Sequence, residues 1–324
     1  MLNLLKKTIV VIIRNLYISL IRVPLSIFYI IYNFRNKYTH YVVVCDHIGD
    51  TLISLGYLKA YKEKNNIKHM TFVTTKGMEP LTECFKQTLD YVMIIRGKGL
   101  RLILDSGKTN FGIHVLKKIK NITIINPENA FVDEFFLYPA RFPMLSLKDC
   151  IRYGELGLEE NVAFDVPIYK VADISEVLGN MKVKKGCTII LAPYASVTNR
   201  ISFSLFDRLA QFFLNNGFQV MTNITDVNQP IAEGSLPLLC NIGDVAMVAE
   251  YCGYVIGLRS GLLDLLCYAK CRLIALYPSD NLYMNFFKLA ALEDVRADVI
   301  EYQLKNENDD LTYIINYVEQ GRGI

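Results

Sequence analysis

The sequence has few histidines and prolines, and its cysteines form no recognisable motif. Among 324 residues there are four histidines, ten prolines and eight cysteines, and no two cysteines have CxxC spacing. We therefore expect no metal site and cysteines that are reduced and structural. Because 52% of the residues are hydrophobic and only 21% are charged, extended disorder is excluded and a folded chain is expected.

Acidic residues are missing from the first 45 positions, although the chain contains 32 of them. Six basic residues lie in that stretch: Lys6, Lys7, Arg14, Arg22, Arg35 and Lys37. The rest of the chain therefore has 29 basic against 32 acidic residues, a net charge of −3 where the whole chain has +3. A weakly acidic body gives no general reason to bind nucleic acid, and no such partner is expected.

Residues 8–34 are mostly apolar but contain no clean window of about 20 apolar residues, the length that spans a bilayer. Arg14, Arg22 and Pro24 interrupt the run, and no small-residue cleavage site follows it. An arginine at the bilayer centre costs about 2.5–3.5 kcal/mol, whereas in an interfacial helix it reaches the headgroups. We expect residues 1–38 to bind a membrane surface and the body to lie at its cytoplasmic face. A hairpin buried in the first domain is the alternative.

Short aliphatic runs alternate with helical periodicity along the body, which is typical of parallel α/β domains. Strands are expected at residues 41–45, 69–74, 91–95, 121–125, 187–192, 218–222, 254–257 and 272–276. The length exceeds one usual core, and no internal repeat is present. We expect two doubly wound domains, residues 39–170 and 171–295, joined through the polar stretch 157–173 and followed by a helical extension, 296–324.

Three segments have the pattern of a strand that runs into a helix start, where parallel sheets bind ligands. The first is CDHIGDTL, which contains Asp46, His47, Gly49 and Asp50. Gly49 is expected to form a close turn, and Asp50 to open the helix. A carboxylate in this position is either a catalytic base or a helix cap.

The second segment, APYASVTNRISFS, is a loop with small and hydroxyl-bearing residues between a strand and a helix. Such a loop can hold a diphosphate, with hydrogen bonds from Ser196 or Thr198 and with Arg200 neutralising the phosphate. A solvated loop with a surface arginine is the alternative.

The third segment, VIGLRSGLLDLL, gives the clearest signal for a phosphate site. Its candidate ligand-binding residues are Arg259, Ser260, Gly261, Leu262 and Asp264. The first N–H groups of the helix and the arginine would contact phosphate, while Asp264 would accept from a sugar or ribose hydroxyl. In the alternative, Arg259 pairs with a carboxylate and Asp264 only stabilises the first helical turn.

Together these segments resemble the heptosyltransferase-like glycosyltransferases, which are metal-independent enzymes with the two-domain GT-B fold. The resemblance covers roughly residues 40–280. In VVVCDHIGDTLISLGYLKAY, the family's catalytic aspartate corresponds to Asp50. Arg200 stands where the family's donor-side loop has its lysine, and Ser202 and Phe203 replace a Trp-Pro pair. Phe206 and Leu209 match the apolar positions of the helix that follows.

The family's Asp-(Ser/Thr)-Gly-x-x-His motif appears here as RSGLLD, so Arg259 and Asp264 replace its aspartate and histidine. The donor sugar is therefore not specified by the resemblance. What the resemblance implies is inverting transfer from a nucleotide sugar, without a metal or other cofactor, with Asp50 as the base. Arg200 and Arg259 would stabilise the leaving diphosphate, and Asp46 and His47 would lie on the acceptor side.

A membrane segment next to a sugar-transfer fold favours a glycan or lipid-linked acceptor, as in surface polysaccharide assembly. Two other functions remain compatible with the sequence. One is a non-catalytic partner protein that keeps the GT-B fold, and the other is a fucosyltransferase-like enzyme that uses a GDP-sugar.

Overall fold

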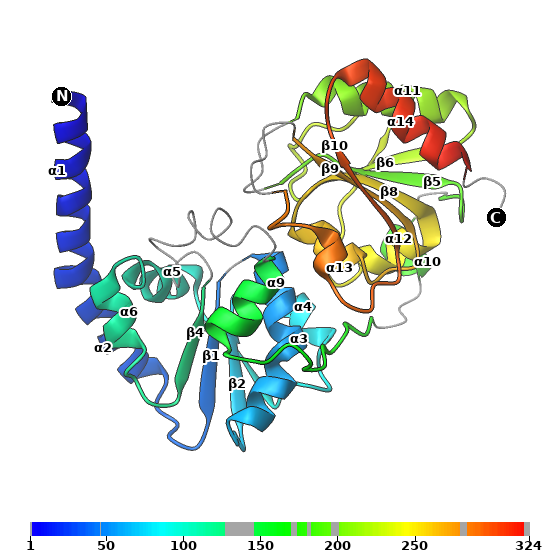
Figure 1. Cartoon of the computed structure of the whole chain (residues 1–324). Helices are drawn as coiled ribbons and strands as arrows, with labels where there is room; N and C mark the ends of the chain where they lie inside the picture. The colour runs from blue at the N-terminus through cyan, green and yellow to red at the C-terminus, as the bar shows by residue number, and fades with distance from the viewer. Residues whose placement is uncertain are drawn as a thin grey trace. The chain divides into compact units, whose positions relative to one another are not determined.

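The computed structural model describes residues 2–45, 47–126, 146–169, 174–179, 183–195, 201–278 and 284–320. The chain forms two compact units, Met1–Asp165 and Val166–Ile324 (Figure 1). The division between them falls inside the polar stretch 157–173. Each unit has its own parallel sheet with helices packed on it.

The first unit is built on a four-stranded sheet in the order β3-β2-β1-β4, and all of its strand pairs are parallel. Its strands are β1 (His40–Val44), β2 (Met70–Thr74), β3 (Tyr91–Ile94) and β4 (Ile122–Ile125). The helices that follow them are α3 (Ile48–Lys64), α4 (Glu79–Glu83), α5 (Gly97–Ser106), α6 (Asn110–Leu116), α9 (Leu147–Asp149) and the π-helix η2 (Cys150–Glu155). The β-branched residues of β1 are fully buried, as expected for a central strand with helices on both faces.

The second unit has six parallel strands in the order β10-β9-β8-β5-β6-β7. These are β5 (Thr188–Ala192), β6 (Gln219–Asn223), β7 (Leu236–Leu238), β8 (Gly253–Leu258), β9 (Arg272–Tyr277) and β10 (Asp298–Gln303). Its helices are α10 (Ile174–Leu178), α11 (Phe203–Asn215), α12 (Val245–Cys252), α13 (Gly261–Leu266), the 3-10 helix η3 (Leu289–Ala291) and α14 (Glu307–Gln320). The doubly wound character expected of both domains is confirmed.

The separate C-terminal extension expected for residues 296–324 is wrong. Asp298–Gln303 form β10, which pairs in parallel with β9, and Ile314 and Val318 of α14 are buried in the core under the sheet. The half-polar sequence of β10 hides it, because its side chains are only partly buried at the edge of the sheet. Helices α5 and α6 were likewise not expected from the sequence.

The N-terminal segment is one helical rod and not a buried hairpin. It consists of α1 (Leu2–Tyr17), a π-helical turn η1 (Ile18–Arg22) and α2 (Val23–Asn33). Helix α2 packs on α5, and η1 packs on α5 and α6. Arg22 pairs with Asp105 of α5, and α1 projects away from the rest of its unit (Figure 1).

Helix α3 is held against the end of the first unit by an aromatic contact at a glycine. The ring of Phe164 lies against Gly56 and is edge-on to the Tyr57 ring, with 5.0 Å between the ring centroids. The Asp165 N–H donates to the Gly56 carbonyl at 2.8 Å. A Cβ atom at position 56 would overlap the Phe164 ring. The glycine is therefore required for this close approach, which fixes the helix that carries Asp50.

We expect Gly56→Ala to lower the free energy of unfolding of the first unit by about 1–3 kcal/mol, because the new methyl overpacks the core. Chemical denaturation followed by circular dichroism measures the change. Gly97→Ala at the start of α5 is the matched control, because its Cβ would meet nothing within 4 Å. It should be neutral or stabilising. Equal stability of the two variants would show that Phe164 does not constrain this helix.

Candidate functional site

Each sheet has one topological switch point, at which the order of successive strands reverses. Open α/β sheets bind ligands at such points. In the first sheet this point lies between β1 and β4, and in the second between β5 and β8. The first and third segments singled out from the sequence follow β1 and β8, and the second follows β5. Each therefore starts at the carboxyl end of a strand that borders a reversal point.

Asp50 is the third residue of α3, and its side chain is half-buried. The helix begins after His47, whose extended backbone (φ −120°, ψ 137°) makes it the N-cap residue. Thr51 closes the first turn, because its N–H donates to the His47 carbonyl at 2.9 Å and its Oγ1 to the Cys45 carbonyl at 3.1 Å. Asp50 is thus not the N-cap, and the first helical turn holds it at the carboxyl edge of the sheet.

The turn expected at Gly49 is wrong. Gly49 is the second residue of α3 and is buried inside the first helical turn, so the change of direction is made by the extended His47. His47 is half-buried, and its side chain does not cap the helix. Asp46 lies outside the described residues, and its acceptor-side role stays a prediction.

A second carboxyl group, which the sequence pattern does not single out, lies on an element packed against the helix of Asp50. Glu155 ends the π-helix η2, which packs against α3 and β4. The pKa of Glu155 is raised to about 7, mainly by burial; Lys117 and a hydrogen bond from the Asn126 backbone lower it, and the charge of Asp50 raises it by a smaller amount. The structure therefore brings together residues from α3, from η2 and from the ends of β4 and α6.

Asn126 is the first residue after β4, and it is 5% exposed. The Cys45 N–H donates to the Ile125 carbonyl at 3.1 Å. The ends of β1 and β4 are therefore still paired at the residue before Asn126. Within the described parts of the chain, Asn126 Oδ1 and Glu155 Oε1 are buried without a hydrogen-bond partner. Buried polar atoms of this kind mark a place where a proton, a water or a ligand is needed.

On the second sheet, β8 and β5 approach closely at Gly257. A Cβ atom there would lie 2.9 Å from the Cβ of Ala192 and 3.0 Å from Leu263 Cδ2 of α13. The next turn contains Ser260, which precedes α13 with an extended backbone, and Gly261 and Leu262, which begin the helix. All three are half-buried, and the Ser260 hydroxyl has no hydrogen-bond partner among the described residues.

Arg259 and Asp264 form the arrangement that the alternative interpretation predicts. They are 6% and 2% exposed and pair through two bonds, Nη2 to Oδ1 at 2.7 Å and Nη1 to Oδ2 at 3.1 Å. Arg259 also donates to the carbonyls of Phe287 and Ser260, each at 2.6 Å. The pair therefore ties the strand end to α13. Their direct contacts with phosphate and with a sugar hydroxyl remain a prediction to which this geometry adds no support.

The other donor-side candidates, Ser196, Thr198 and Arg200, lie outside the described residues. Pro193 to Ala195 lead toward them from the carboxyl end of β5. Among the described residues no group of three or more histidine, cysteine, aspartate or glutamate side chains is arranged to hold a metal.

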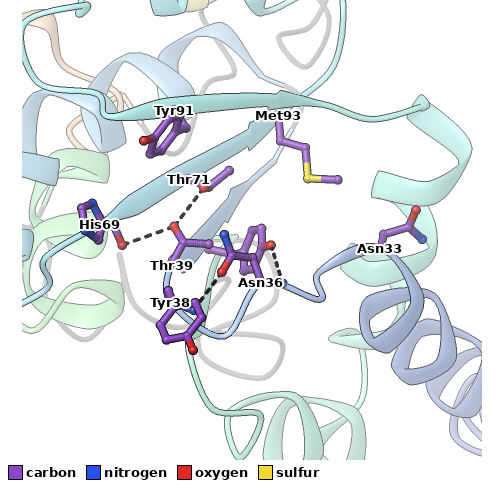
Figure 2. Close-up of a pocket in the computed structure, with 9 residues that line it drawn as sticks. Asn33, Asn36, Tyr38, Thr39, His69, Thr71, Tyr91 and Met93 are labelled. Atoms are coloured by element: carbon purple, nitrogen blue, oxygen red, sulfur yellow. Dashed lines mark hydrogen bonds between the residues drawn. The ribbon is translucent and has the colours of Figure 1, made fainter.

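A pocket of about 420 Å³ lies at the opposite end of the first sheet, by the amino ends of β1, β2 and β3 (Figure 2). Polar and aromatic residues and one methionine line it: Asn33, Asn36, Tyr38, Thr39, Tyr41, His69, Thr71, Tyr91 and Met93. Thr39 Oγ1 and Thr71 Oγ1 lie 2.9 Å apart in its wall. Because Asp50 follows the carboxyl end of β1, this pocket is not part of the Asp50 site.

Neither a family model nor a curated protein sequence matches the chain. Solved structures do. Escherichia coli ADP-heptose LPS heptosyltransferase II has a TM-score of 0.57 at 11% identity, with 87% of this chain and 99% of that one covered. A family 9 glycosyl transferase from Veillonella parvula DSM 2008 has a TM-score of 0.54 at 14% identity, with 87% and 89% covered.

E. coli heptosyltransferase WaaC with ADP-2-deoxy-2-fluoro heptose has a TM-score of 0.52 at 12% identity, again with 87% of this chain and 99% of that one covered. At these identities the likeness shows the fold. The chain has the two-unit α/β fold of the GT-B glycosyltransferases, and the expected fold class is confirmed. Within that fold, the chain is similar to heptosyltransferases.

We expect Asp264→Asn to lower the free energy of unfolding of the second unit by about 3–5 kcal/mol, because it leaves the buried Arg259 charge without its partner. Urea denaturation measures the loss. Arg208→Ala is the control, because the Arg208–Glu307 pair is 3.2 Å long and exposed, and its loss should cost about 1 kcal/mol or less. Similar losses in both variants would argue against a structural role for the buried pair.

Proposed function

We propose that the protein is a glycosyltransferase that moves a sugar from a nucleotide-sugar donor to a hydroxyl acceptor with inversion and without a metal ion. The observation that carries the proposal is the position of Asp50. It is a half-buried carboxylate on the first turn of α3, at the reversal point of a GT-B-type sheet. The similarity to a heptosyltransferase solved with an ADP-sugar analogue supports a nucleotide-sugar donor.

In this mechanism Asp50 accepts the proton of the acceptor hydroxyl while the hydroxyl oxygen attacks the anomeric carbon. The bond from that carbon to the diphosphate oxygen breaks, and the diphosphate leaves with the electron pair. The negative charge that develops on it would be met by the N–H groups at Ser260, Gly261 and Leu262 and by the Ser260 hydroxyl. Ser196, Thr198 and Arg200 are the further donor-side candidates.

We expect Asp50→Asn to lower kcat by about 10²–10⁴-fold, because an amide cannot accept the proton. The measurement is transfer or donor hydrolysis against a panel of nucleotide sugars. Glu63→Gln is the matched control, because this exposed carboxylate lies at the far end of the same helix. It should keep full activity, and an unchanged rate in Asp50→Asn would remove Asp50 from the mechanism.

The second candidate function is a non-catalytic partner protein that keeps the fold and only binds a nucleotide or another protein. The observation that favours it is the Arg259–Asp264 pair, which occupies two altered motif positions with an internal contact. The same donor panel separates the two functions, because binding without turnover of any donor would favour the partner role. Preference for a GDP-sugar would instead favour a fucosyltransferase-like enzyme.

We also propose that the N-terminal rod binds a membrane surface. By length and composition Thr8–Asn33 could cross a bilayer, and only 11% of its apolar window is buried. However, α2 packs on the first unit through Val23, Ser26 and Ile30, so this half is not free to span. Helix α1, which ends at Tyr17, contains Arg14, and this favours a helix that lies in the interface.

The outward face of the rod carries large apolar side chains from Ile9 to Tyr32. Its large exposed side chains include Val10 at 64%, Ile13 at 60%, Leu20 at 71%, Phe28 at 69% and Ile31 at 65%. An exposed apolar patch of this kind marks a site that interacts with a membrane or with another protein. Apart from Arg22, which pairs with Asp105, the basic residues of the segment favour an anionic surface such as the cytoplasmic leaflet, and thereby a lipid-linked saccharide as acceptor in surface polysaccharide assembly.

We expect the double variant Leu20→Glu, Phe28→Glu to reduce co-flotation with vesicles that contain anionic lipid by at least tenfold, because two charges replace buried apolar contacts with lipid. Both side chains point out of the unit, so the variant avoids the α2–α5 contact that a deletion of residues 1–38 would destroy. Val227→Glu, at a 74% exposed residue of the second unit, is the control.

The acceptor is tested with the same variants. Turnover of a polyprenyl-linked acceptor in vesicles should fall with the double variant, while turnover of a soluble acceptor analogue stays unchanged. Equal losses with both acceptors would argue against a lipid-linked substrate.

A further inference from the structure

We propose that the pocket by the amino ends of β1, β2 and β3 binds a neutral saccharide, at a site separate from that of Asp50. We call it the amino-end pocket (Figure 2). Its volume of about 420 Å³ lies within the range of about 300–1,000 Å³ that is typical of small-molecule sites. The proposal goes beyond the proposed function, because it does not require Asp50 to be a catalytic base.

The floor of the amino-end pocket is a row of side chains that the register of the sheet brings together. Tyr41 of β1 pairs with Thr71 of β2, which pairs in turn with Tyr91 of β3. Paired residues of neighbouring strands present their side chains on the same face of a sheet, and Met93, two residues after Tyr91, shares that face. Thr71 and Tyr41 are 8% and 7% exposed, whereas Tyr91 is 61% exposed. The row therefore forms a buried polar floor with an aromatic ring at its open edge.

The segment between the N-terminal rod and β1 forms a wall of the pocket. Phe34 stacks on Tyr41 with 4.7 Å between the ring centroids, and the Asn36 N–H donates to the Tyr41 hydroxyl at 3.3 Å. The Tyr38 N–H donates to Asn36 Oδ1 at 2.9 Å. Contacts within the protein therefore hold the wall in place before a ligand binds, which lowers the entropy cost of binding.

The groups that line the pocket match both surfaces of a sugar ring. A pyranose has a rim of hydroxyl groups and a face of C–H groups, and it binds to neutral hydrogen-bonding side chains next to aromatic rings. Tyr38 is 89% exposed and Tyr91 is 61% exposed, so both rings are open to contact with C–H groups. The amide nitrogen of Asn36 and the hydroxyls of Tyr38 and Tyr91 have no hydrogen-bond partner among the described residues. These groups are available to the hydroxyls of a sugar.

The charges around the pocket disfavour an anionic ligand such as a phosphate. Among the described residues that line it, His69 is the only one whose side chain can carry a positive charge. Arg35 and Lys37 belong to the same segment but do not line the pocket, and the Arg35 guanidinium lies 4.4 Å from the centroid of the Tyr32 ring. Asn33 ends α2, and the partial negative charge at the carboxyl end of a helix opposes an anion. We therefore expect an uncharged ligand.

The test is saturation-transfer difference NMR with a binding titration of the full-length protein. The probes are glucose, lactose, maltose and N,N′-diacetylchitobiose, with glucose 6-phosphate as the anionic counterpart of glucose. We expect saturation transfer to the C–H protons of a neutral sugar, and weaker binding of the phosphate. Tyr91→Ala should weaken binding by about tenfold, because it removes the ring at the open edge, and Tyr91→Phe should lose less. Tyr313→Ala, at a 42% exposed tyrosine of the second unit, is the matched control and should leave the affinity unchanged.

Three results would overturn the proposal: no saturation transfer to any of the neutral sugars, tighter binding of glucose 6-phosphate than of glucose, or unchanged affinity in Tyr91→Ala. Sugar transfer to a soluble acceptor should be the same in Tyr91→Ala as in the wild type, and loss of both binding and transfer would refute a separate site. Binding that depends on Tyr91, without turnover of any donor, would refute the proposed function and retain the pocket.

The saccharide has two sources that the same chemistry would recognise, a free glycan or the head of a glycolipid. The pocket lies at the end of the rod that we propose binds a membrane. Free lactose and phosphatidylcholine vesicles that contain lactosylceramide separate the two. Retention on the glycolipid vesicles that falls in Tyr91→Ala would support the pocket with a membrane-borne ligand, and binding of lactose alone would support it with a free one.

Discussion

The parallel pairing of β1 with β4 is the constraint on which the Asp50 site depends. It places the residue after β4 next to the turn that leads from β1 into α3, although about eighty residues separate them along the chain. The same geometry recurs in the second unit, where β8 pairs with β5 and Gly257 allows a close approach to Ala192. In both sheets the chemistry-bearing residues therefore follow the two strands at a reversal point.

The two units differ in whether their buried charged side chains have partners. In the second unit Arg259 and Asp264 satisfy each other through two bonds, and the arginine's remaining contacts are with backbone carbonyls. A closed pair of this kind holds a turn in place and leaves little to offer a ligand. In the first unit one carboxyl oxygen of Glu155 is buried without a donor among the described residues, and burial raises the pKa of this group to about 7. A proton on this oxygen, a water or a ligand hydroxyl would satisfy it.

The N-terminal rod has one face packed on the first unit and an opposite, apolar face that we propose binds a membrane. Ser26 and Arg22 face the protein, where Arg22 pairs with Asp105, while Leu20 and Phe28 face outward. The attachment of α2 to α5 means that the outward apolar face has a fixed orientation relative to the first sheet. A surface that binds lipid through this face would therefore hold the first unit in a defined orientation, which suits an acceptor that is itself embedded in lipid.

The local pattern of the sequence determined the elements whose signals lie within a single stretch. The β-branched run before Asp46 and the apolar residues of α3 predicted β1 and its helix to within a residue or two, because burial on both faces requires such residues. The periodicity that fixed the doubly wound units is of the same kind. Asp50 could be chosen because it stands at the helix start that follows a strand signal and corresponds to the aspartate of the resembled family's motif.

Tertiary structure alone decided the features that depend on distant neighbours. Glu155 lies more than a hundred residues from Asp50 along the chain, and only the packing of η2 on α3 and β4 brings it to the helix that carries Asp50. Arg259 has the same sequence signature whether it binds a phosphate or Asp264, and its burial is what separates the two cases. Strand β10 is half-polar and became recognisable only through its pairing with β9. The reason is common to all three: sequence patterns report which residues are buried, and the partner that a buried polar group finds is set by the fold.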